Sequence, residues 1–223
     1  MDFVQILILS IIQGITEFLP ISSQSHLILT SKLLGMSDQG LSFDIALHAG
    51  SLLAILIYYR KEVTKIMSIS DEGIQYLKLI IIGSIPLPII GLLFVDIVSE
   101  NLRTINTIAF MTIVFALLLY FAERRNHENE NSFATLSFFT IIFIGFMQTL
   151  AIMPGVSRSG IVITAALLLS YSREDSIKIA FLLAIPAIFM ATVYQSMQLY
   201  EVGNIEILNE HLLGMILSFI FSY

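Results

Sequence analysis

The sequence predicts an all-α polytopic membrane protein with an inverted-topology repeat, whose two re-entrant helical hairpins meet inside one bundle. Three observations support this fold class. Hydrophobic residues make up 57% of the 223 residues and charged residues only 13%, the mean hydropathy is +0.88, and polar breaks interrupt two of the apolar segments. Soluble domains carry about 25% charged residues. We therefore expect the lipid bilayer as a partner, and no nucleic acid.

The apolar segments set the expected helices. A span needs about 20 residues, so segments 76–95, 104–122 and 178–197 are long enough, and 45–59 nearly is if Tyr58, Tyr59 and Arg60 anchor an interface. Segments 24–36 and 160–171 are too short and follow Pro-Ser breaks, which predicts half-length helices that enter and return. The complete set is 3–19, 24–36, 45–59, 76–95, 104–122, 134–153, 160–171, 178–197 and 211–223.

The chain contains a weak internal repeat. An offset of 135 residues places Gln13 on Gln148 and Ser22 on Ser157, and it also aligns the apolar segments. We expect a single membrane domain in which repeat one covers about 1–125 and repeat two about 134–223. The counterpart of segment 104–122 is missing from repeat two, so the chain is expected either to be a fragment or to end early, with a partner covering the exposed face.

Loop charges predict the orientation. The loops at 96–103 and 199–211 carry five acidic residues against the single Arg103. By the positive-inside rule these loops face outward and the basic loops face the cytoplasm. The two hairpins then enter from opposite faces. The basic loops and their edges contain eight of the eleven Lys and Arg residues: Arg60, Lys61, Lys65, Lys78, Arg124, Arg125, Arg173 and Lys178.

Few other features constrain the protein. Asp2 is the only early charge, so the N-terminal apolar segment lacks the basic region of a signal peptide and is expected to be retained. The chain has no cysteine, which excludes disulfides and Cys-ligated metals.

The first hairpin carries ionisable groups at membrane depth, where such groups indicate function. Gln13 and Glu17 are one helical turn apart and face the same way. Together they are candidate ligands of a divalent cation, Mg²⁺ or Ca²⁺. Alternatively, Glu17 orients or deprotonates a base, or it is only an internal charge partner of Arg158. His26 follows the serine-rich break at Ser22 and Ser23, and it is a candidate general base or nucleophile.

The second hairpin reads Pro-Gly-Val-Ser-Arg-Ser-Gly at 154–160 and opens a new helix. The Arg158 guanidinium, the hydroxyls of Ser157 and Ser159, and the close backbone approach that Gly160 allows indicate an anion site suited to phosphate. The alternative is a capped turn with Arg158 extending to an interface. No acidic residue stands between Ala134 and Glu174 to neutralise the arginine, which favours the anion site.

The sequence does not decide the role of His48. It lies among the small residues Ala46, Ala49, Gly50, Ser51 and Ala54, which indicate a close helix-packing face. The side chain is equally compatible with packing and with a supporting role behind the site. His127 and His211 are expected to be solvated.

These motifs resemble the bacitracin-resistance family of undecaprenyl-diphosphate phosphatases. The resemblance rests on 13–23 with His26, on Leu-His-Ala-Gly-Ser-Leu at 47–52, on 154–160 and on Phe-Leu-Leu-Ala-Ile-Pro-Ala at 181–187. It implies a multi-pass enzyme of the plasma or inner membrane that converts a C55 polyprenyl diphosphate to the monophosphate. The enzyme would recycle the lipid carrier of cell-wall polymers and confer bacitracin resistance, and a homodimer is expected.

The resemblance also implies roles for individual residues. The family's Glu/Gln-x-x-x-Glu motif falls on Gln13 and Glu17, its catalytic histidine on His26, and its serine pair on Ser22 and Ser23. Its phosphate-binding arginine falls on Arg158, beside Ser157, Ser159 and Gly160. The sequence departs from the family at Gln24 and Ser25, where Ser or Thr and then Gly usually precede the histidine, and the family continues for several tens of residues past Tyr223.

The expected mechanism is in-line attack on the terminal phosphoryl group held by Arg158, Ser157, Ser159 and a cation on Glu17. The attacking group is His26 itself, or Ser23 or water activated by His26. Two alternatives stay open. A transporter or flippase would bind the phosphorylated lipid without hydrolysing it, and a truncated homologue would be inactive.

Overall fold

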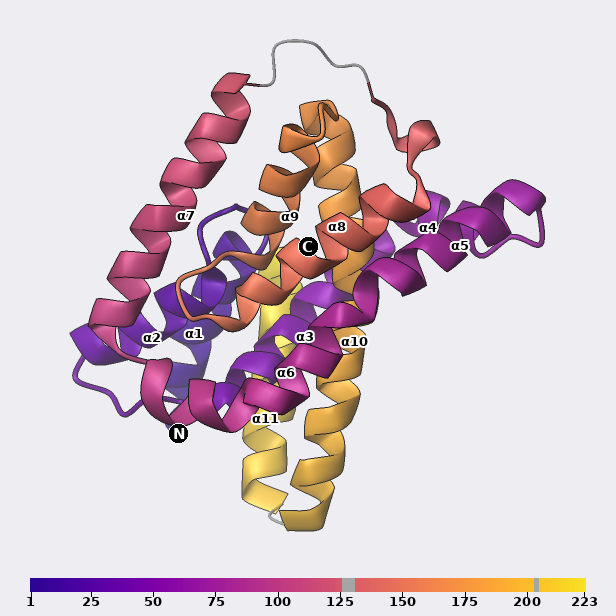
Figure 1. Cartoon of the computed structure of the whole chain (residues 1–223). Helices are drawn as coiled ribbons and strands as arrows, with labels where there is room; N and C mark the ends of the chain where they lie inside the picture. Colours follow the sequence, from indigo (N-terminus) through magenta and orange to yellow (C-terminus); the bar gives the residue numbers. More distant parts are fainter. Residues whose placement is uncertain (126–130, 203–204) are drawn as a thin grey trace.

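The computed structural model describes residues 1–125, 131–202 and 205–223, and within these residues the protein is helical without strands (Figure 1). The helices are α1 (Phe3–Thr16), α2 (Ser23–Leu33), α3 (Gly40–Tyr58), α4 (Arg60–Ile66), α5 (Asp71–Ser84), α6 (Pro86–Ile97), α7 (Ile105–Arg125), α8 (Phe138–Thr149), α9 (Arg158–Leu168), α10 (Arg173–Val202) and α11 (Ile205–Ser222). Short helical turns, Val98–Leu102, Phe133–Thr135 and Leu150–Ile152, join some of them.

Four helical stretches in the described part of the chain are long and apolar enough to cross a membrane: Gly40–Tyr58, Asp71–Phe94, Ile105–Arg125 and Arg173–Glu201. They overlap the four segments for which spans were predicted, 45–59, 76–95, 104–122 and 178–197. α2 and α9 have 11 residues each. At about 1.5 Å of rise per residue, such helices cover only about half of the hydrocarbon core. The protein is therefore an all-helical membrane protein in which long and short helices are combined.

Two predicted segments differ from the structure. Segment 76–95 was expected as one helix, but the chain forms α5 and α6 and breaks at Ile85, because Pro86 lacks the N–H that would continue the hydrogen-bond ladder. The last segment was expected at 211–223, whereas α11 begins at Ile205 and contains 18 residues.

The small residues of α3 form a helix-packing face, as predicted. A Cβ on Gly50 would overlap the backbone of Met215 and Phe219 in α11, and the Ser51 hydroxyl lies 3.2 Å from that of Ser218. On another side of α3, Leu52 and Ile55 pack with Ala184 and Ile188 of α10. Close packing of this kind fixes α3 between α10 and α11.

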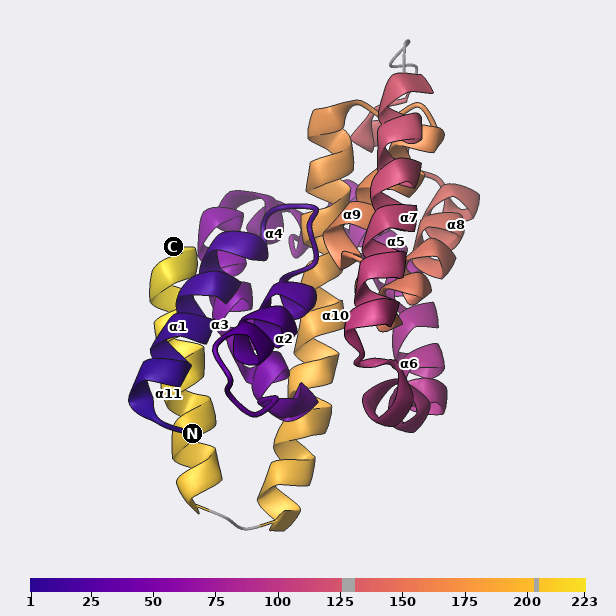
Figure 2. The ribbon, with the colours of Figure 1, turned by 90° about the vertical axis from the view of Figure 1, so that its left-hand side faces the viewer.

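α10 runs along the molecule and separates two groups of helices. In Figure 2, α1, α2, α3 and α11 lie on one side of it, and α7, α8 and α9 lie on the other. Ion pairs join helix ends on both sides of the molecule. Arg173 at the start of α10 pairs with Glu123 near the end of α7, and the N-terminus pairs with Glu210 near the start of α11. The loop after α1 and the loop before α9 come together beside α10 (Figures 1 and 2).

Candidate active site

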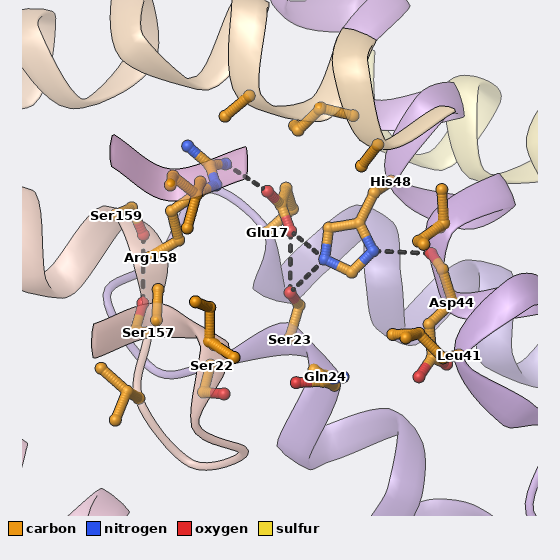
Figure 3. A pocket seen from close by; sticks show the side chains of 18 of the residues that line it. Glu17, Ser22, Ser23, Gln24, Leu41, Asp44, His48, Ser157, Arg158 and Ser159 are labelled. Atoms are coloured by element: carbon orange, nitrogen blue, oxygen red, sulfur yellow. Dashed lines mark hydrogen bonds and ion pairs between the residues drawn. The ribbon is translucent and has the colours of Figure 1, made fainter. Parts of the chain in front are cut away.

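A cavity of about 190 Å³ lies where the two hairpin loops meet (Figure 3). Ser159 Oγ donates to the Leu19 carbonyl oxygen over 3.4 Å, so the two loops are in direct contact. The polar residues that line the cavity come from the α1–α2 loop, α3 and the start of α9: Glu17, Ser22, Ser23, Gln24, Asp44, His48, Ser157, Arg158 and Ser159. Seven of these were singled out from the sequence; Gln24 and Asp44 were not proposed as site residues.

An ion pair joins the two hairpins across the cavity. Arg158 Nη2 donates to Glu17 Oε1 over 2.7 Å, and the side chains are only 16% and 4% exposed. The pairing that the sequence left as one alternative for Glu17 is therefore present. It uses only part of the guanidinium, because Arg158 Nη1 is buried and has no hydrogen-bond partner in the described chain. A planar fork with an unused donor is suited to an oxygen of a phosphate group.

The second oxygen of Glu17 is surrounded by polar atoms from three elements. Gln13 Nε2 lies 3.0 Å, Ser23 Oγ 2.7 Å and His48 Nε2 3.2 Å from Glu17 Oε2. Ser23 Oγ also lies 3.3 Å from His48 Nε2, and Figure 3 shows these three side chains pointing toward one another. Glu17 is thus the centre of a buried polar cluster that brings Ser23 and His48 together.

His26 lies outside this cluster. Its Nδ1 bonds to the Ser22 carbonyl oxygen of its own helix over 2.9 Å, and the residue is not among those lining the cavity. It lies three residues after Ser23 on the first turn of α2, but in the described chain no hydrogen bond joins the two side chains. The structure therefore brings Glu17 and Ser23 together but not His26, whose catalytic role stays a prediction.

The loop before α9 has the features of an anion site. Ser157 caps the helix, since its Oγ accepts the Gly160 N–H over 3.1 Å and lies 3.1 Å from Ser159 Oγ. Gly155 has φ +104°, and a Cβ there would lie 2.6 Å from the Ile108 carbonyl oxygen of α7. Only glycine fits this conformation and this close approach. The result is a tight turn that presents Arg158 and both hydroxyls at the positive end of α9.

Ser22 shows that the first loop is also constrained. Its φ is 61°, a left-handed conformation that is uncommon for a residue with a Cβ. Its hydroxyl lies 2.9 Å from Ser25 Oγ. Strained backbone held by its surroundings is common at functional sites, and Ser22 lies on the cavity wall.

Glu17 and Gln13 carry oxygen atoms of the kind that bind Mg²⁺ or Ca²⁺. Gln13 Nε2 is used by Glu17, which leaves Gln13 Oε1 buried and without a partner in the described chain. No group of three or more His, Cys, Asp or Glu side chains that would hold a metal alone occurs among the described residues. Mg²⁺ commonly takes one or two carboxylates and completes its shell with water and phosphate oxygens.

Sequence reasoning missed the support behind His48. His48 Nδ1 lies 2.6 Å from the Asp44 carbonyl oxygen, and the buried Asp44 carboxylate accepts from Gln39 and Arg103 over 2.6 and 3.0 Å. Arg103 also pairs with Asp38 over 2.7 Å. Burial opposes ionisation of Asp38, but the hydrogen bonds and charge of Arg103 and the Gly40 N–H lower the pKa of this carboxyl below 3.8.

The signal that could have identified this arrangement was the isolated Arg103. It is the only basic residue of the acidic loop at 96–103, and Asp44 is an acidic residue at the start of an apolar segment. The predicted repeat aligns Gln148 with Gln13. Gln148 is fully buried, and both polar atoms of its side-chain amide lack a partner in the described chain.

Comparison with known proteins gives a consistent result over the whole chain. Residues 6–223 match the family described as bacitracin resistance protein BacA. The chain is 41% identical to the undecaprenyl-diphosphatase of Vesicomyosocius okutanii subsp. Calyptogena okutanii and 42% identical to that of Saccharophagus degradans, with 100% of this chain and 88% and 86% of those relatives covered. It is also 41% identical to undecaprenyl-diphosphatase 1 of Pseudoalteromonas translucida, of which it covers 87%.

Proposed function

The chain belongs to the bacitracin resistance protein family, and we propose that it hydrolyses undecaprenyl diphosphate to the monophosphate and inorganic phosphate. Relatives over 40% identical across the full chain carry the name undecaprenyl-diphosphatase. This reaction recycles the lipid carrier of cell-wall polymers, and bacitracin resistance follows from membership of the family. A transporter or flippase that leaves the diphosphate intact is not favoured by these relatives.

One observation carries the proposal: Arg158 lines the same cavity as Ser23, and one terminal nitrogen of its guanidinium has no partner in the described chain. Arg158 is already fixed by Glu17 over 2.7 Å, while its Nη1 has no partner in the described chain. A terminal phosphate bound by Nη1, Ser157 and Ser159 would lie between the two hairpins, with its charge matched by the guanidinium. Ser22 and the Gly160 turn complete this binding surface.

Within this site we assign the attack on phosphorus to Ser23. Its Oγ lines the cavity and contacts Glu17 over 2.7 Å. Of the three attacking groups predicted, this one has support from the described contacts; a water molecule or His26 would have to reach the phosphorus without such contacts. The fixed donors of the second hairpin would stabilise the charge of the transition state.

A divalent cation, Mg²⁺ or Ca²⁺, is part of the proposal. Glu17 and the unpartnered Gln13 Oε1 would hold it, and bound cations supply charge neutralisation at phosphate oxygens. Binding of phosphate to Arg158 would weaken the pairing of Arg158 with Glu17 and leave the carboxylate available to the cation.

We propose that the hairpins are re-entrant and related by an inverted repeat. The support is the short length of α2 and α9, which have 11 residues each, and the contact between the two loops. The separation of basic from acidic loops along the sequence also agrees with hairpins that enter from opposite faces. Broken helices at membrane depth are tolerated where they line a polar cavity. The prenyl chain would stay in the lipid phase of the inner membrane, and a homodimer is the expected assembly.

The test is release of inorganic phosphate from undecaprenyl diphosphate by purified protein in detergent, with and without added Mg²⁺. We expect wild-type turnover that falls on chelation. Arg158→Lys should lose roughly 10²-fold or more, because it keeps a charge beside Glu17 but lacks the planar fork with two terminal nitrogens. His26→Ala tests the histidine implied by the resemblance. Lipid binding without phosphate release by the wild type would instead support the transporter.

A further inference from the structure

The rings of His26, His48 and His211 are held in the same local way. In each, Nδ1 lies close to the carbonyl oxygen four residues earlier: 2.9 Å from Ser22, 2.6 Å from Asp44 and 2.7 Å from Ile207. A carbonyl oxygen only accepts hydrogen bonds, so Nδ1 carries the hydrogen in all three rings. In the neutral imidazole, Nε2 is then an acceptor. The three histidines therefore differ in what their Nε2 atoms face.

Only the Nε2 of His48 faces the cavity. It lies 3.3 Å from Ser23 Oγ and 3.2 Å from Glu17 Oε2, and Figure 3 shows the ring edge directed at both groups. His211 Nε2 contacts the Ser42 hydroxyl, away from the cavity. For His26, the bond to the Ser22 carbonyl is the only ring hydrogen bond found in the described chain. His26 is closer to Ser23 in the sequence, whereas the ring of His48 is the one that contacts the Ser23 hydroxyl in the structure.

The surroundings of His48 suit a proton acceptor. The Asp44 carbonyl fixes the ring from one side, and the Asp44 side chain is itself held by Arg103 over 3.0 Å and by Gln39. The Glu17 carboxylate lies 3.2 Å from Nε2, the nitrogen that would take the proton, and its negative charge would stabilise the imidazolium that forms. Arg158 binds the opposite oxygen of Glu17 and does not contact the ring.

We propose that His48 is the general base of the reaction and accepts the proton of Ser23; this inference rests on the proposed phosphatase function. In the first step, Ser23 Oγ forms a bond to the terminal phosphorus, and the bond from phosphorus to the bridging oxygen breaks. The electron pair leaves with the lipid monophosphate, and the Ser23 proton moves to His48 Nε2.

The second step returns the enzyme to its starting state. A water oxygen forms a bond to the phosphorus, the bond to Ser23 Oγ breaks, and His48 gives its proton back to that oxygen. Both hydrogens of the water leave on dihydrogen phosphate. Proton transfer by a positioned side chain typically contributes 10²–10⁴-fold to the rate.

The test compares His48→Gln and His48→Ala with the matched control His211→Gln in the phosphate-release assay. His211 has the same local anchor but no contact with Glu17 or Ser23. We expect both His48 variants to lose about 10²–10⁴-fold in kcat with a nearly unchanged KM, and the control to keep its activity. Added imidazole should restore turnover in His48→Ala, because the truncated ring leaves space beside Ser23.

His26→Ala serves as the second comparison. Rescue of His48→Ala but not of His26→Ala would support the assignment, since a ring that only supports the fold is not replaced by free imidazole. Rescue of His26→Ala alone, or wild-type kcat in a folded His48→Gln protein, would overturn it. If His48→Ala does not fold, the kcat of His48→Gln decides. Failure of the wild-type protein to release phosphate would instead contradict the proposed function itself.

Discussion

Glu17 and Arg158 illustrate how single residues combine stability and chemistry at this site. Both side chains are buried, and each is the other's charge partner over 2.7 Å. Removing one partner of a buried pair leaves an uncompensated charge and typically costs about 3–5 kcal/mol. We expect Arg158→Met to lower the thermal unfolding temperature in detergent and to abolish phosphate release.

A double variant separates the two effects. In Glu17→Gln/Arg158→Met both charges are absent, so the unfolding temperature should return toward the wild-type value, because an apolar or neutral pair of similar size replaces the ion pair without a buried charge. Activity should not return, since the phosphate-binding donor is still missing. Equal instability of the single and double variants would show that the pair does not govern the stability of the site.

At the scale of the elements, the α8–α9 connection depends on Gly155. With φ +104° and the Ile108 carbonyl oxygen 2.6 Å from any added Cβ, Gly155→Ala is expected to cost about 1–3 kcal/mol and to displace Arg158. The measurement is thermal unfolding together with phosphate release. Gly91 in α6 is the matched control, because nothing lies within 4 Å of its Cβ position. Gly91→Ala should keep or raise stability by up to about 1 kcal/mol.

Elements were predictable from sequence where local chemistry dominates. The proline at 20 and the Pro-Gly turn at 154–155 interrupt apolar segments, and they marked both loops of the site. Pro86 was not recognised as a break, because it lies within a continuous apolar segment and the span length agreed with the bilayer. The choice between His26 and His48 required the packing of α1, α2 and α3, which helical periodicity alone does not provide.

At the scale of the whole molecule, the two hairpin loops meet beside α10 and the charged loops lie at the ends of the helices. Ser159 reaches the Leu19 carbonyl oxygen, so each loop completes the site of the other. The proposed repeat aligns these two loops, because its offset of 135 residues places Ser22 on Ser157.

The orientation of the molecule can be tested directly because the chain contains no cysteine. Single substitutions to cysteine at Lys61, Arg125, Asn101 and Leu34, all exposed, give one thiol each. If the basic loops are cytoplasmic and the first hairpin enters from outside, a membrane-impermeant maleimide applied to spheroplasts should label Asn101→Cys and Leu34→Cys. Lys61→Cys and Arg125→Cys should react only after permeabilisation. Labelling of both Leu34→Cys and Lys61→Cys before permeabilisation would place both ends of α3 on the outer face, and it would contradict the predicted orientation.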